Sequence, residues 1–95
     1  MAFRVEAYLH SDSITPNKGG AIVKVSAQTD FATKTEGFIN FCKQVAMVAF
    51  IQSAENWSDI KTNEVEYSQR CVEAKDALEK ELKEKITVEK IAVIS

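Results

Sequence analysis

The apolar residues of this chain change their spacing along the sequence, and the order of these changes restricts the folds that the chain can adopt. In residues 3–10 and again in 21–28, apolar and polar residues alternate, which is typical of half-buried strands. In 38–52 and 67–82 the apolar residues recur at helical spacing instead. Residues 86–94 are rich in β-branched side chains and short enough for a strand. The predicted order is therefore strand, strand, helix, helix, strand.

The connections between these segments predict one antiparallel sheet. A loop of about ten residues, rich in turn formers, separates the first two strands, so they most simply pair antiparallel. The last strand most simply joins them, and the helices then pack on one face. We therefore expect a two-layer α+β fold, in which a three-stranded antiparallel sheet carries two helices. The outward face of the sheet is expected to combine Tyr8 and Ile22 with Arg4, Glu6 and Lys24.

Local signals place the ends of the two helices. Thr33 and Glu36 have the spacing of a capping box, in which the Thr oxygen accepts a helix amide and the Glu reaches back. Trp57 is expected to close the corner between the helices. The second helix is expected to begin within residues 58–62 and to run to about Lys83.

Length and charge limit the partners that the sequence supports. The 95 residues suggest a single domain, 1–95. The net charge of −2 gives no expectation that the chain binds nucleic acid or an anionic membrane. No apolar run approaches the ~20 residues of a membrane span, and the first residues lack the long apolar stretch of a signal peptide. A cytoplasmic location is therefore expected.

The sequence lacks the residue patterns of an enzyme with covalent chemistry. His10 has no neighbouring Cys, Ser or carboxylate arrangement that signals a nucleophile. Gly19 and Gly20 lack the spacing of a phosphate-binding loop, and Asp12 and Asp30 do not make a calcium loop. We therefore expect no catalytic residue, no cofactor and no bound metal.

The two cysteines show no sign of a shared site. Cys42 and Cys71 both fall within the helical patterns and have no metal-ligand spacing. Buried free thiols are the favoured interpretation, and an intermolecular disulfide through Cys71 is the alternative.

The transition from the second strand to the first helix is the most informative stretch for function. Thr29, Asp30 and Phe31 follow the alternating segment directly, and such junctions are often functional. On the residues alone, Phe31 is most simply a core ring that closes the helix start, and Asp30 an acid that interacts with helix amides. The alternative is that both side chains are exposed, so that the ring can fill a pocket of a partner.

The residues around this junction resemble the signature of the elongation factor Ts family. That signature reads approximately V-N-C-[EQ]-T-D-F-V-A, followed by a few polar residues, an acid and a Phe. The chain agrees with it at Val25, Gln28, Thr29, Asp30, Phe31, Glu36 and Phe38, and departs from it at Ser26, Ala27 and Ala32. Downstream, residues 88–92 are similar to the I-R-R-V-A strand of the family.

The resemblance spans nearly the whole chain but only part of a full-length factor. It corresponds to the first module of the family's core, also called the dimerisation domain, without the N-terminal helical domain and the second core module. It implies a nucleotide-exchange factor that binds the translation GTPase elongation factor Tu and speeds GDP release. In the family the Asp-Phe pair inserts near the magnesium and nucleotide site of the GTPase, which gives these roles to Asp30 and Phe31, with Thr29 beside them.

A second contact implied by the resemblance involves Leu82. The family carries a Lys-Ile-Gly-Glu-Asn-Ile segment before the last strand, and residues 81–86 align with it. Leu82 stands for the first Ile, whereas Lys83 replaces the Gly, so a close backbone approach that only Gly allows would be lost.

Two other functions remain open. The chain could bind elongation factor Tu without accelerating exchange, because two domains of the full-length factor are missing. It could instead be a dimerisation module, in which a homodimer recovers the pairing of the two core modules.

Overall fold

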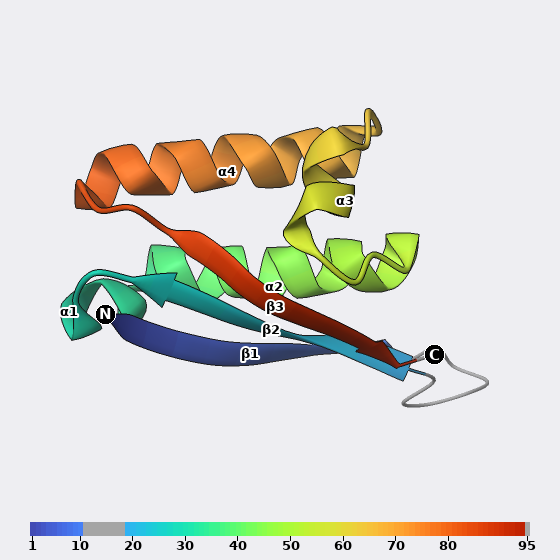
Figure 1. Ribbon diagram of the computed structural model, residues 1–95, viewed down its shortest axis with the longest axis horizontal. Helices are drawn as coiled ribbons and strands as arrows, with labels where there is room; N and C mark the ends of the chain where they lie inside the picture. Colours follow the sequence, from blue (N-terminus) through green and yellow to red (C-terminus); the bar gives the residue numbers. More distant parts are fainter. Residues whose placement is uncertain (11–18, 95) are drawn as a thin grey trace.

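The three predicted strands form one antiparallel sheet, as expected. The structure, a computed structural model, describes residues 1–10 and 19–94 (Figure 1). Strands β1 (Ala2–His10), β2 (Gly19–Ala27) and β3 (Thr87–Ile94) form one antiparallel sheet with β2 in the centre. The helices lie on one face of this sheet, so the predicted α+β class is confirmed.

Residues 1–10 and 19–94 contain four helices, where two were expected. Helix α2 (Glu36–Gln52) packs against the sheet, and α4 (Glu66–Leu82) packs alongside α2. The short helices α1 (Asp30–Thr33) and α3 (Trp57–Thr62) were not predicted. Both have an N-cap of their own but only four and six residues, and so short a helix gives no apolar period to recognise.

The predicted starts of both long helices were wrong. Thr33 lies inside α1, and the N-cap of α2 is Thr35, whose hydroxyl accepts a hydrogen bond from the Phe38 amide at 3.3 Å. The segment expected to open the second long helix forms α3, which ends because Asn63 adopts an extended conformation. Helix α4 begins only at Glu66.

The core lies between the sheet and α2. Its largest fully buried side chains come from β2, α2, α3 and the residue just before β3, and include Val23, Val25, Phe38, Val45, Val48, Ile60 and Ile86. Trp57 packs against this core as expected, with its ring edge-on to Phe41 at 6.3 Å between centroids. Cys42 and Cys71 are both buried free thiols, so Cys71 offers no surface sulfur for an intermolecular disulfide.

The expected orientation of β1 was wrong. The register pairs Arg4 with Val25 and Glu6 with Val23, and residues opposite each other on paired strands point to the same face. Because Val23 and Val25 are fully buried, Arg4 and Glu6 face the helices. The same register turns Tyr8 inward, where its ring lies 6.0 Å from that of Phe50 in α2.

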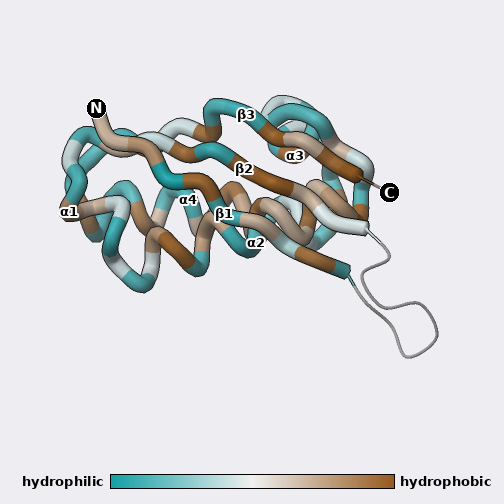
Figure 2. Tube along the Cα trace, turned by 90° about the horizontal axis from the view of Figure 1, so that it is seen from below, coloured by the Kyte–Doolittle hydropathy of each residue, from teal (hydrophilic) through white to brown (hydrophobic). Residues whose placement is uncertain are grey.

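The outer face of the sheet is consequently apolar along β1. Phe3 is 50%, Val5 60% and Leu9 68% exposed, and Ile22 and Ile94 of the neighbouring strands are exposed beside them. Figure 2 views this side of the molecule and shows hydrophobic segments on all three strands. The inner polar residues of β1 and its outer apolar ones thus reverse the usual pattern of a half-buried strand.

Candidate partner-binding site

The site lies where β2 passes into α1. Thr29 has an extended conformation and caps α1, because its hydroxyl oxygen accepts a hydrogen bond from the Ala32 amide at 3.3 Å. One helical turn follows, and the Lys34 amide closes it on the Phe31 carbonyl at 3.1 Å. The strand therefore ends in a single capped turn rather than in a flexible loop.

This turn has one buried and one exposed side. Ala32 and Thr33 are buried, whereas Asp30 is exposed and the Phe31 side chain is 75% exposed. Burying a Phe side chain is worth about 1.5–3 kcal/mol, and most of that stabilisation is absent here. The ordinary interpretation of Phe31 as a core ring is thus wrong, and the ring is available to a partner.

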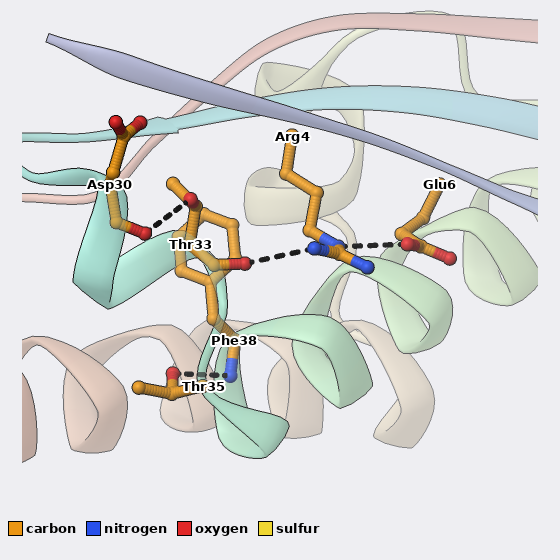
Figure 3. Close-up of polar contacts among 6 residues, drawn as sticks. All are labelled: Arg4, Glu6, Asp30, Thr33, Thr35 and Phe38. Carbon is orange, nitrogen blue, oxygen red and sulfur yellow. Dashed lines mark hydrogen bonds and ion pairs between the residues drawn. The ribbon is translucent and has the colours of Figure 1, made fainter.

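Arg4 of β1 reaches the end of the turn, and Glu6 of the same strand pairs with it (Figure 3). Nη1 of Arg4 donates a hydrogen bond to the carbonyl oxygen of Thr33 at 3.2 Å, and Nε donates to the Glu6 carboxylate at 2.8 Å. The Thr33 hydroxyl in turn donates to the Asp30 carbonyl at 2.8 Å. The last carbonyl of a helix lacks an internal partner, and Arg4 supplies one.

Glu84 reaches the beginning of the same turn. Its Oε1 accepts hydrogen bonds from the amides of Gln28 and Thr29 at 2.9 and 3.0 Å, and its Oε2 accepts one from the Thr29 hydroxyl at 2.7 Å. These hydrogen bonds, first that from the Thr29 hydroxyl and then those from the two amides, stabilise the ionised carboxylate. They therefore lower the pKa of Glu84. The connection between α4 and β3 is thereby attached to the end of β2.

The C-terminal end of α4, where Leu82 lies, is at the same end of the molecule as α1 (Figure 1). Leu82 is the last residue of α4, is half-buried and packs against the core. Lys83 follows it in a left-handed conformation, with φ of 56°. The backbone at this position thus takes the shape that favours glycine, although the side chain present is a lysine.

Comparisons with known proteins give the chain a family. The sequence profile described as Elongation factor TS matches residues 28–95. The chain belongs to the elongation factor Ts family. Elongation factor Ts of Corynebacterium urealyticum is 32% identical over 94 residues, which cover 87% of this chain and 33% of the relative.

Two further relatives carry the same name. That of Corynebacterium jeikeium is 29% identical over 84 residues, or 88% of this chain and 30% of the relative. That of Geotalea daltonii is 46% identical over 43 residues, or 45% of this chain and 18% of the relative. The chain thus spans about a third of the length of the Corynebacterium relatives. No solved structure matches it.

The match to the elongation factor Ts profile covers the turn itself but not the residues of β1 that contact it. Thr29, Asp30 and Phe31 all fall within the match. Asp30 and Phe31 stand exposed together, and the Thr29 hydroxyl is hydrogen-bonded within the chain to Glu84 and Ala32. Sequence reasoning missed Glu84 and Arg4. Glu84 aligns with the Glu of the family segment at 81–86, so a signal was present, while Arg4 lies outside the matched residues.

Within 1–10 and 19–94, no cluster of three or more His, Cys, Asp or Glu side chains has a geometry suited to a metal ion. In the same ranges, no helix combines the length and the apolar character needed to cross a membrane.

Proposed function

We propose that this chain binds elongation factor Tu through Asp30 and Phe31 and promotes the release of GDP. The observation that carries the proposal is the 75% exposure of Phe31 on a turn whose backbone is hydrogen-bonded at both ends. In this proposal residues 1–95 act as one core module of the family.

The proposed mechanism requires no covalent chemistry. A protein that binds the nucleotide-free GTPase better than the GDP-bound GTPase must weaken GDP binding by the same factor. The Phe31 ring would act as a wedge near the Mg²⁺ and nucleotide site of elongation factor Tu, with Asp30 as its polar neighbour. Displacing the groups that position Mg²⁺ leaves the diphosphate less neutralised, so GDP dissociates faster. Leu82, at the same end of the molecule, would lie at the edge of this contact.

The test is the release of labelled GDP from a bacterial elongation factor Tu, followed by stopped flow. The wild-type chain should accelerate release, and Phe31→Ala should weaken binding roughly 30-fold, or about 2 kcal/mol, as for an aromatic anchor in a pocket. Tyr67→Ala is the matched control, since Tyr67 is 51% exposed at the far end of α4. Unchanged affinity of a folded Phe31→Ala variant would refute the proposal.

The same experiment distinguishes exchange from binding alone. Because the chain spans about a third of its Corynebacterium relatives, it carries fewer contact surfaces than a full-length factor. Binding with an unchanged rate of GDP release would assign it the alternative role, a module that occupies the GTPase in order to recruit or inhibit it.

A second candidate function is self-association through the outer face of the sheet. The exposed side chains of Phe3, Val5 and Leu9 line β1 on the side of the sheet that none of the described helices covers. A shallow groove of about 210 Å³ opens at the Gly20 end of this face, between Leu9 and Ile94. Two such faces from two copies of the chain would pack as a sandwich of aligned sheets.

The size of this face predicts a weak homodimer. Three strands of nine residues or fewer cover roughly 30 Å by 14 Å, or about 400 Å² in projection, whereas stable interfaces bury about 800 Å² per partner. Sedimentation over a wide concentration range should show a monomer–dimer equilibrium that Val5→Lys shifts toward monomer. Ile51→Lys, at an exposed position of α2, should leave it unchanged. A monomer at every concentration would exclude this function.

A further inference from the structure

Glu84 joins two segments that lie 55 residues apart in the sequence, at the point where the exposed turn begins. We propose that Glu84 is a positioning residue, whose carboxylate orients the turn that presents Asp30 and Phe31 to the partner GTPase. This inference rests on the proposed function and adds to it a residue that does not touch the partner itself.

The sheet does not hold the residues that Glu84 contacts. The ladder between β1 and β2 ends with the pair Ala2 and Ala27, and the ladder between β2 and β3 ends with Ser26 and Thr87. The amides of residues 28 and 29 therefore lie beyond both ladders. Among the described residues, the hydrogen-bond partner of both amides is the Glu84 carboxylate.

The carboxylate acts on the turn through Thr29. One oxygen of Glu84 accepts both amides, and the other accepts the Thr29 hydroxyl. The same hydroxyl oxygen accepts the Ala32 amide, inside α1. Glu84 therefore restricts the backbone immediately before Asp30 and also the cap that starts the turn. Hydrogen bonds to an ionised acceptor are about twice as strong as neutral ones.

Loss of this carboxylate should loosen the turn without unfolding the protein. Gln28 and Thr29 are exposed, so water can replace Glu84 as the partner of their amides at small cost. The core beneath them stays intact, because Ala32 and Ile86 remain buried. The turn is also held at its other end by Arg4.

The consequence for binding follows from pre-organisation. When only a fraction of the molecules presents the turn in the binding-competent orientation, the apparent affinity falls by that fraction. A side chain that removes alternative orientations therefore strengthens binding without contacting the partner. The Phe31 wedge requires such restriction, since a ring on a mobile loop must be ordered at the moment of insertion.

The experiment compares Glu84→Ala and Glu84→Gln with wild type and with Phe31→Ala. Glu81→Ala is the matched control, because Glu81 is an exposed carboxylate in the last turn of α4. Two quantities are measured for each variant well below its unfolding midpoint: the affinity for nucleotide-free elongation factor Tu, and the hydrogen exchange of individual backbone amides.

Glu84→Ala should weaken binding roughly tenfold, and Glu84→Gln should weaken it less because its amide oxygen still accepts. In the Glu84 variants, hydrogen exchange should accelerate at the amides of Gln28 and Thr29, while the amides of Val23 and Val25 keep their protection. A merely structural role would instead loosen the whole sheet, so uniform acceleration refutes the inference. Unchanged exchange at residues 28 and 29 also refutes it.

The binding measurements separate this inference from the proposed function. If Phe31→Ala weakens binding while both Glu84 variants bind as wild type does, the positioning role is wrong and the proposed function stands. If Phe31→Ala binds as wild type, the proposed function is wrong and the positioning role falls with it. The hydrogen-exchange data then still decide whether Glu84 restricts the backbone of the turn.

Discussion

The Arg4 guanidinium lies 3.2 Å from the carbonyl oxygen of Thr33, so the edge strand of the sheet holds the C-terminal end of the exposed turn. The guanidinium is itself oriented by Glu6, two residues further along β1. These two polar side chains occupy positions on the inner face of the sheet, where a strand ordinarily carries apolar residues. Their burial is compatible with stability because each supplies the other with an opposite charge.

Arg4→Met should therefore lower the free energy of unfolding by about 1 kcal/mol. Methionine keeps the apolar stem but leaves the Thr33 carbonyl and the Glu6 carboxylate without their partner. The measurement is urea denaturation, compared with Arg70→Met. Arg70 pairs with Glu66 at a side-chain exposure of 67%, and such surface pairs contribute about 0–1 kcal/mol. Equal effects of both substitutions would show that the Arg4 contact is also only a surface pair.

Lys83→Gly should raise stability by roughly 0.5–1 kcal/mol. The φ of 56° at Lys83 costs a residue with a side chain about 1–2 kcal/mol, and the greater freedom of glycine in the unfolded chain offsets part of the gain. Thermal unfolding of this variant is to be compared with that of Lys80→Gly, inside the last turns of α4, which should lose about 1 kcal/mol. A loss of stability in Lys83→Gly would mean that the lysine side chain contributes more than its backbone shape costs.

The elements of this fold were predictable where a long run of apolar residues has a clear period. The alternation along β2 and the wide apolar stripe of α2 each specify a period and a buried face. The junction between β2 and the first helices was also recognisable as a candidate site, because Thr29, Asp30 and Phe31 occur together at a change of period. Exposure of the Phe31 ring, however, followed only from the family resemblance, since on the residues alone a ring before a helix is most simply part of the core.

Other features depend on contacts between distant segments. The alternation in β1 permits either face to turn inward, and the pairing with Val23 and Val25 decides which one does. In α4 the expected stripe position of Tyr67 is exposed, and Ser68 is buried instead because its hydroxyl is hydrogen-bonded to Gln52 in α2. A hydrogen bond across elements thus replaces an apolar contact, which no period in the sequence indicates.

The stability of the chain should fall as the pH drops below about 4.5, in part through Glu79. Partial burial favours the neutral form of this carboxyl, but hydrogen bonds from the Ile86 amide at 2.9 Å and the Lys75 ammonium at 3.2 Å outweigh it, so the pKa of Glu79 is lowered from 4.5. The unfolded state therefore binds more protons than the folded state just below that pH, and protonation favours unfolding.

Urea midpoints measured from neutral to acidic pH provide the check on Glu79. Glu79→Gln should lower stability at neutral pH and flatten the acidic fall, because the variant has no carboxylate to protonate there. Glu73→Gln, at an exposed position of the same helix, should keep the wild-type profile. An unchanged acidic fall in Glu79→Gln would assign the pH dependence to other carboxylates.

Both cysteines should resist alkylation in the folded protein at pH 8. Burial raises the pKa of Cys42 to about 12, with a further contribution from nearby Glu6, and burial raises the pKa of Cys71 to about 11. The thiolate is the reactive form. At this pH the folded chain contains almost no cysteine thiolate, and burial shields both sulfur atoms from the reagent. Iodoacetamide labelling followed by mass spectrometry should show slow modification that accelerates in denaturant. Rapid labelling of Cys71 alone would indicate that α4 separates from α2 far more readily than the sheet unfolds.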